Sequence, residues 1–334
     1  MADLILDIHA HFLPAEWIET VRRNGEPYGC RIDEDGNGRI WLRLGDSTPF
    51  QLTAPLFDIE HRLKVIAERG FTRQVLSPPM TIIGYGLRDR QGQTLSRLFN
   101  ETNADIARRS AGRLIPVATV PMQSPRAAIE ELDYAVKNLG IHMVEVGTHV
   151  NGANLDEECF EPFFKRACEL GVFVQVHPHH DSVAGVERLS RYYLRNLIGN
   201  PVDTAIAGAS LIFGGVLNRY SDLNVYLVHG GGALPYLLGR LCHGYEGIPA
   251  THTVPEPPDK YFRRIYFDSI VHEPRALVFL YDLVGEGQLM LGTDYPYDNT
   301  GDKNPLRTLE RAGLPRASSI LGDTAAKLLR LIES

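Results

Sequence analysis

Five residues that could bind a metal ion, or act beside one, each follow a short apolar run of the chain. They are His9, His11, His177, His229 and Asp294. His9 and His11 are two residues apart, so on an extended strand both side chains lie on one face and can converge on one cation. Neutral imidazoles and a carboxylate are ligands that suit zinc. The pattern predicts a metal site if the ends of these runs meet in space.

The runs belong to a regular alternation of apolar, β-branched segments with amphipathic helical stretches, which is typical of βα units around a parallel sheet. The eight predicted strands are 4–6, 72–76, 114–120, 142–146, 172–176, 225–228, 265–267 and 289–291. Eight such units favour an α/β fold, a TIM-type (β/α)8 barrel, in which all strands end at one mouth. The alternative, an open doubly wound sheet, needs a glycine-rich phosphate turn, whereas Asp-Ile-His-Ala-His follows the first strand.

One segment departs from this alternation. Alternating residues between Cys30 and Leu44 flank the turn-rich Asp35-Gly36-Asn37-Gly38, which predicts a small β-hairpin after the first strand. We expect residues 1–334 to form a single barrel domain. Within it, residues 14–57 are expected to be an insertion that carries the hairpin and covers the barrel mouth.

Composition excludes several classes of protein. The chain has 34 Lys+Arg against 41 Asp+Glu, a formal charge of −7 that disfavours binding to nucleic acid or to an anionic membrane. No stretch is long and apolar enough to span a bilayer, and the first residues lack the basic region of a secretory signal. The four cysteines form no C-x-x-C pair, which suits a reducing compartment. We expect a cytoplasmic protein.

The chain resembles the amidohydrolase superfamily, and within it the aminocarboxymuconate semialdehyde decarboxylase-like branch of metal-dependent, non-oxidative decarboxylases. The segments that carry the resemblance are Asp7-Ile8-His9-Ala10-His11-Phe12, Val176-His177-Pro178, His229-Gly230-Gly231-Gly232 with Leu238-Gly239-Arg240, and Leu291-Gly292-Thr293-Asp294-Tyr295-Pro296. They span nearly the whole chain. The His-Gly-Gly-Gly and Gly-Thr-Asp-Tyr-Pro elements are specific to the branch, whereas H-x-H marks only the superfamily.

The resemblance implies one divalent ion, expected to be Zn²⁺ with Mn²⁺ as the alternative. Its implied ligands are His9, His11, His177 and Asp294. Binuclear members of the superfamily place a modified lysine at the end of strand four, but residues 144–148 offer none, so one metal is expected.

The resemblance also implies that His229 and Asp294 are catalytic, with His229 as the acid/base beside metal-bound water. A histidine titrates near neutrality and can pass a proton to a reacting carbon. A fifth ligand or a structural histidine is the alternative for His229. In the relatives, an arginine at the position of Arg240 holds a substrate carboxylate in the neighbouring subunit, so a homodimer is expected. A surface arginine is the alternative for Arg240.

The chain departs from the branch at two positions that concern the substrate. Gln51 stands where the relatives carry a second carboxylate-binding arginine, and an amide can hydrogen-bond a carboxylate but cannot neutralise it. His179 stands where they have tryptophan. Both changes predict a different acid, one that is aromatic or heteroaromatic and less charged. His149 and Tyr85, after strands four and two, are further candidates for substrate binding, or else solvated loop residues. Asp268, after strand seven, is expected next to the ligands.

Together these features predict a metal-dependent, non-oxidative decarboxylase, a carboxy-lyase acting on an aromatic, heteroaromatic or muconate-type carboxylic acid. The alternative is a metal-dependent hydrolase or hydratase acting on a cyclic ester, an amide or an unsaturated acid, because one fold supports several reactions. A third class, a non-catalytic metal-binding protein, is disfavoured by the intact ligand set and His229. The expected partner is a small-molecule carboxylate, with neither nucleic acid nor membrane.

Overall fold

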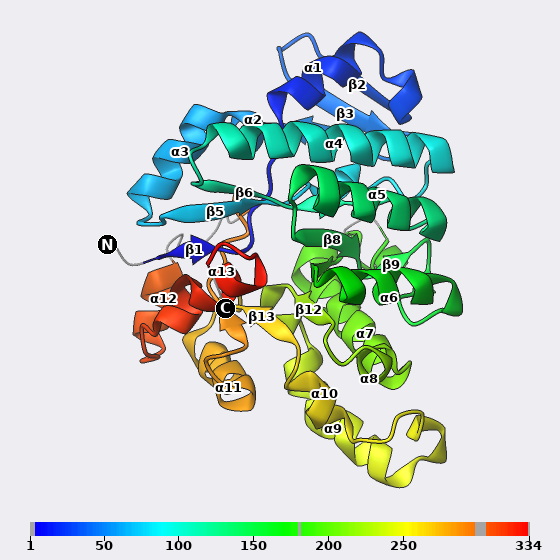
Figure 1. Ribbon diagram of the computed structural model, residues 1–334, viewed down its shortest axis with the longest axis vertical. Coiled ribbons are helices and arrows are strands. Elements are labelled where there is room, and N and C mark those ends of the chain that lie inside the picture. The colour runs from blue at the N-terminus through cyan, green and yellow to red at the C-terminus, as the bar shows by residue number, and fades with distance from the viewer. Residues whose placement is uncertain (1–3, 180–181, 298–304, 333–334) are drawn as a thin grey trace.

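The computed structural model describes residues 4–179, 182–297 and 305–332. Short parallel strands form its centre, and helices cover them on the outside (Figure 1). The central strands are β1 (Leu6–Asp7), β5 (Arg73–Leu76), β6 (Leu114–Pro116), β7 (Ala118–Thr119), β8 (Met143–Gly147), β11 (Phe173–His177), β12 (Asn224–Leu227), β13 (Tyr266–Asp268) and β14 (Leu289–Met290). Each of the eight predicted strands is present. The ninth central strand arises because the predicted strand 114–120 is divided at Val117 into β6 and β7.

The pairing of these strands follows the order of the chain. One parallel ladder runs β1-β5-β6 and the other runs β7-β8-β11-β12-β13-β14. The outer strands of the two ladders also meet, since the Ile8 N–H donates to the Leu291 carbonyl at 2.9 Å and Ala10 bridges Tyr295. The first and last strands are therefore neighbours, as a (β/α)8 barrel requires.

Some of the helices begin or end at residues that cap them. The helices outside the insertion are α3 (Ile59–Glu68), α4 (Asp89–Arg109), α5 (Pro125–Leu139), α6 (Glu161–Leu170), α7 (Asn200–Phe213), α8 (Val216–Arg219), α9 (Leu234–Gly247), α10 (Pro258–Phe262), α11 (Pro274–Val284), α12 (Pro305–Arg311) and α13 (Thr324–Leu328). The Asp58 carboxylate accepts from the His61 N–H at the start of α3. Gly140 and Gly171 end α5 and α6 in the left-handed conformation that glycine adopts without strain. No helix in the described ranges has the length and apolarity needed to cross a membrane.

The helix and sheet of the insertion form a small layer that packs on α4, above the barrel in the view of Figure 1. It contains α1 (Ala15–Arg23), α2 (Ala54–Phe57) and an antiparallel sheet of β2 (Cys30–Glu34), β3 (Ile40–Leu44) and β4 (Phe50–Leu52). The sequence predicted only the first two strands, because β4 has three residues and no alternating run. Trp17, Leu42 and Leu52 pack in the core of this layer, and Trp17 is fully buried.

The barrel interior is apolar at the end away from the mouth. There the inward side chains of the strands, including Phe173 and Met290, pack against Ala325 and Leu329 at the C-terminal helix α13. Closer to the mouth the interior becomes polar, with Gln175 and Glu145 buried side by side on β11 and β8. A short hairpin of β9 (His149–Val150) and β10 (Ala153–Asn154) follows β8 at the mouth.

Candidate metal centre

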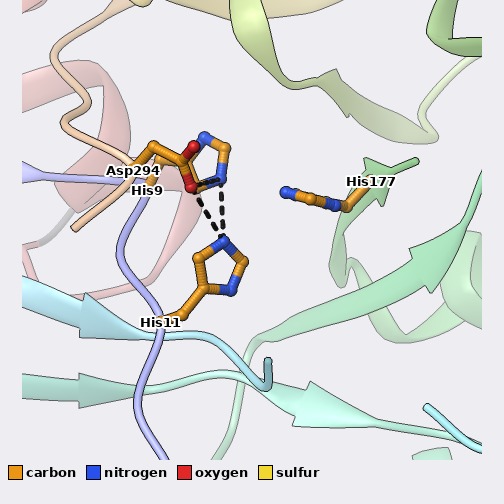
Figure 2. A group of neighbouring side chains, drawn as sticks. All are labelled: His9, His11, His177 and Asp294. Atoms are coloured by element: carbon orange, nitrogen blue, oxygen red, sulfur yellow. Dashed lines mark hydrogen bonds and ion pairs between the residues drawn. The ribbon is translucent and has the colours of Figure 1, made fainter. Parts of the chain in front are cut away.

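Four side chains from three strand ends converge at the barrel mouth (Figure 2). His9 and His11 follow β1, His177 is the last residue of β11, and Asp294 follows β14. Their ligand atoms all lie within 4.8 Å of one another. The two Nε2 atoms of His9 and His11 are 3.3 Å apart, and Asp294 Oδ1 is 3.4 Å from the first and 3.1 Å from the second. These are the four residues that the sequence motifs implied as metal ligands.

The second ring nitrogen of each histidine fixes which nitrogen carries the proton. Each Nδ1 lies within hydrogen-bond distance of an oxygen that can only accept. These oxygens are Asp268 Oδ2 for His9 (2.9 Å), Pro78 O for His11 (2.8 Å) and Pro178 O for His177 (2.9 Å). Each Nδ1 therefore donates, and each neutral ring turns the lone pair of Nε2 toward the centre of the cluster.

The donor set of the cluster fits a divalent cation. Three Nε2 atoms and a carboxylate face one another at short distance, which is unfavourable unless positive charge, a metal ion or a proton on an imidazole, lies among them. His177 Nε2 is buried and has no hydrogen-bond partner among the residues that the structure describes. Imidazole nitrogen together with one carboxylate oxygen suits Zn²⁺ and related ions. The chain therefore carries a metal-binding site.

Electrostatics favour the metal-binding protonation states of His9, His177 and Asp294. For His11, burial lowers the pKa, but the hydrogen bond with Asp294 and nearby carboxylate charge outweigh burial and raise it. Burial and the neighbouring imidazoles of His11 and His229 hold the pKa of His177 well below its usual value, and burial lowers the pKa of His9. Burial alone would raise the pKa of Asp294, but hydrogen bonds from His11 and His229 hold it well below its usual value. Neutral imidazoles beside an ionised carboxylate are what metal binding requires.

His229 lies beside the cluster and outside the group of four. It follows β12 with a left-handed backbone, φ 55°, which is uncommon for a residue with a side chain. Its Nε2 lies 3.5 Å from Asp294 Oδ2, and its ring centroid is 5.1 Å from those of His9 and His177. An imidazole held there can give or take a proton at the edge of the metal site.

Asp268, the last residue of β13, connects the ligand His9 to His229. Its buried carboxylate accepts five hydrogen bonds. The donors are His9 Nδ1 (2.9 Å), the Tyr226 hydroxyl (2.6 Å) and the backbone N–H groups of His229 (3.0 Å), Gly230 (2.8 Å) and Ile270 (3.0 Å). Burial raises the pKa of Asp268, but the hydrogen bond and charge of His9 outweigh burial and leave it below its usual value. One carboxylate therefore orients both a ligand and the neighbouring histidine.

The glycines after His229 are needed by the backbone of this turn. A Cβ on Gly232, at φ 60°, would lie 2.2 Å from the Pro201 carbonyl oxygen, and one on Gly231 would lie 2.6 Å from the Phe267 ring. Neither clash is relieved by a simple side-chain rotation, since one partner is backbone and the other a buried core ring. The turn that holds His229 thus depends on glycine.

The cluster forms part of the wall of a cavity of about 400 Å³. His11, His177, His229 and Asp294 line one part of it, and the insertion contributes Thr48, Pro49 and Phe50. A larger cavity of about 640 Å³ adjoins it, since Thr48, Phe50, Thr81 and His179 line both. A third cavity, of about 410 Å³, shares His229 and Asp294 and extends toward Tyr236 on α9.

The residues predicted to bind substrate are distributed unevenly among these cavities. His179 lines the metal-site cavity and the larger one, whereas Tyr85 and His149 line only the larger one. The Tyr85 hydroxyl accepts from the Gly147 N–H at 3.0 Å, and His149 Nε2 lies 2.9 Å from the Ser182 carbonyl. Both side chains are therefore held by the protein itself.

Two of the predicted contacts line none of the three cavities. Gln51 lies on β4 next to Phe50, and it is Phe50 that lines the metal-site cavity, because successive side chains of a strand point to opposite faces. Arg240 lies on an exposed part of α9. The structure also brings Arg195 and Tyr297 to the metal-site cavity. No motif in the sequence indicated Arg195, which begins the π-helical turn Arg195–Gly199.

Comparisons with known proteins agree with this architecture. A family model described as Amidohydrolase matches residues 6–331. The 2-amino-3-carboxymuconate-6-semialdehyde decarboxylase of Dictyostelium discoideum is 30% identical over 333 residues, which cover 98% of this chain and 92% of that protein.

Solved structures show the same fold. The 5-carboxyvanillate decarboxylase of Sphingomonas paucimobilis has a TM-score of 0.81 at 19% identity, over 98% of this chain and 99% of that one. A dihydroxybenzoic acid decarboxylase from Polaromonas, solved with manganese and the inhibitor 2-nitroresorcinol, has a TM-score of 0.79 at 20% identity, over 99% and 98%. The fold predicted from the sequence is confirmed, and the chain belongs to the amidohydrolase family.

Proposed function

We propose that the protein is a metal-dependent, non-oxidative decarboxylase of an aromatic, heteroaromatic or muconate-type carboxylic acid. The observation that carries the proposal is the convergence of three Nε2 lone pairs and the Asp294 carboxylate at a cavity, with His229 beside them. The named relative and both solved neighbours described above are decarboxylases. The reaction replaces the carboxylate on carbon by a proton and releases carbon dioxide.

We assign His9, His11, His177 and Asp294 as the ligands of the ion. When bound, a divalent metal at this site supplies Lewis-acid polarisation of a substrate oxygen and a fixed point for orienting the substrate. Asp268 keeps His9 in the tautomer that binds the ion. We propose Zn²⁺ as the resident ion because the donor set is rich in imidazole, with Mn²⁺, which the Polaromonas neighbour holds, as the alternative.

His229 is assigned the proton transfer. Its Nε2 faces Asp294 Oδ2 at 3.5 Å, so the carboxylate orients the ring while the imidazole delivers a proton to the carbon that loses carbon dioxide. Phe50, Met80 and Tyr297 give the cavity wall an apolar part. Such a surface excludes water and favours a neutral product, carbon dioxide, over a bound carboxylate.

The remaining assignments concern the surroundings of the site. We propose that residues 14–57 cover the mouth, because Thr48, Pro49 and Phe50 line the metal-site cavity. We propose a homodimer in which Arg240, exposed on α9, serves the neighbouring subunit, and a cytoplasmic location, which suits four free cysteines. His179, Tyr85 and His149 are assigned to substrate binding.

The test is release of carbon dioxide. Zinc- and manganese-loaded protein is incubated with ortho-hydroxy and ortho-amino aromatic acids and with muconate-type acids, and carbon dioxide is measured. Release from any of them supports the proposal, and silence across the panel with metal confirmed contradicts it. Net addition of water would assign a hydrolase or hydratase instead. With an active acid in hand, His229→Ala should abolish turnover while the metal content stays at that of the unaltered protein.

A further inference from the structure

We propose that Arg195 is the cation by which each chain anchors the substrate in its own site, and that it binds an anionic group which the substrate keeps when carbon dioxide leaves. The inference rests on the proposed decarboxylation. It adds a residue that determines specificity, and it changes the class of acid that we expect the protein to accept.

Arg195 reaches the metal-site cavity from the segment between β11 and α7. It begins a π-helical turn, Arg195–Gly199, that leads directly into α7. Its side chain is half-buried and lines the same cavity as His177, His229 and Asp294. Of the described residues that line this cavity, Arg195 is the one arginine or lysine. A permanently charged group thus belongs to the wall that a bound acid would contact.

Neither of the two positions at which the sequence suggested carboxylate recognition supplies a cation to the site of its own chain. Position 51 is a glutamine that lines none of the three cavities, and Arg240 lies away from the site of its own chain. From Gln51 and His179 we expected a less charged acid. Arg195 brings a cation to the cavity from a different element, and that expectation is reversed in the proposal.

The chemistry decides which group of the acid Arg195 should hold. During decarboxylation the negative charge of the leaving carboxylate moves onto carbon, and carbon dioxide departs neutral. A guanidinium paired with that carboxylate would stabilise the starting state more than the transition state and would slow the reaction. Paired with a second carboxylate or an acidic hydroxyl, it holds the substrate throughout the reaction. The arrangement therefore favours acids that keep a second anionic group.

The test compares two probes that differ in one charge, isophthalate and its monoamide, 3-carbamoylbenzoate. Their dissociation constants are measured by calorimetry on the metal-loaded protein, so the result does not depend on turnover. The unaltered protein should prefer the diacid. Arg195→Met should weaken binding of isophthalate about 10- to 100-fold, the effect of losing a charge-assisted pair, and change binding of the monoamide little. Arg195→Lys should recover part of the preference.

Arg191→Met is the matched control, because Arg191 is exposed on the same segment and stacks on Tyr192 at 5.2 Å. It should leave both dissociation constants unchanged. The proposal is overturned if the unaltered protein shows no preference for the diacid, if Arg195→Met weakens both probes equally or neither, or if Arg191→Met has the same effect. Failure to release carbon dioxide from any acid would refute the decarboxylase assignment separately, since the binding comparison stands without it.

Discussion

Replacing Asp268 by asparagine should weaken metal binding although Asp268 is not itself a ligand. Asparagine has the same shape but carries one acceptor oxygen and one amide group in place of two acceptor oxygens. Oδ1 of Asp268 receives two backbone N–H groups, from Gly230 and Ile270, which cannot turn away. The amide oxygen is therefore expected at Oδ1, which places the NH₂ group at Oδ2, opposite His9 Nδ1.

The magnitude follows from the tautomer of His9. With an NH₂ group opposite it at about 2.9 Å, Nδ1 must accept rather than donate, and the ring proton moves to Nε2, the atom that faces the metal position. Binding the ion then requires the ring proton to return to Nδ1, where the N–H of His9 and the NH₂ group of the asparagine are two donors that face each other. Loss of such an orienting partner typically costs 10- to 100-fold in metal affinity, or about 1.4–2.8 kcal/mol. The His229 N–H, also bonded to Oδ2, loses its acceptor at the same time.

The assay is competition for zinc between the protein and a chelator of known affinity, at constant pH. Thermal unfolding of the metal-free proteins shows separately whether Asp268→Asn is folded. Tyr226→Phe is the control, because it removes one donor to Asp268 and leaves the carboxylate opposite His9. Its zinc affinity should stay within about threefold of the unaltered protein. A folded Asp268→Asn protein with unaltered zinc affinity would refute the reasoning.

Two further predictions concern stability. Burial raises the pKa of Glu145 from 4.5 to about 8. Between these two pH values the unfolded chain has released a proton that the folded chain keeps, so the free energy of unfolding decreases as the pH rises. The total decrease is up to about 5 kcal/mol. Glu145→Gln should therefore stabilise the chelator-treated protein at pH 8 and hardly at pH 4.5. Equal urea midpoint differences at both pH values would contradict this. Gly232→Ala should lower stability by more than about 1 kcal/mol, and lower turnover by displacing His229, because its Cβ would lie 2.2 Å from the Pro201 carbonyl oxygen. A variant that melts and reacts like the unaltered protein would show that this turn tolerates a side chain.

The barrel and the ligand cluster could be predicted from sequence because both depend on local order. Each strand is an apolar run, and parallel strands of a barrel end at one mouth, so His177 and Asp294 could be placed beside His9 without knowing any distance. The H-x-H spacing needed only the two-residue period of a strand.

The features that the sequence did not predict depend on contacts between segments that carry no motif and no regular hydrophobic spacing. The third strand of the insertion, β4, has only three residues, and Phe50 rather than Gln51 lines the metal-site cavity. Arg195 reaches the cavity from the π-helical turn before α7, and no motif in the sequence marks that position. The sequence placed Asp268 near the ligands. The number of hydrogen bonds that its carboxylate accepts could not be predicted, because it depends on the turn after β12, in which His229 has a left-handed backbone conformation.

The contact between the first and last strands has a consequence for the order in which the protein is made. A ribosome releases His9 and His11 early, but the Leu291 carbonyl that accepts from Ile8, and the ligand Asp294, emerge almost 300 residues later. Until then β1 lacks one of its two neighbours and exposes an unpaired edge, a feature that promotes association between chains. Tight metal capture is thus one of the last events of synthesis, and a chain interrupted before residue 294 should emerge without its ion.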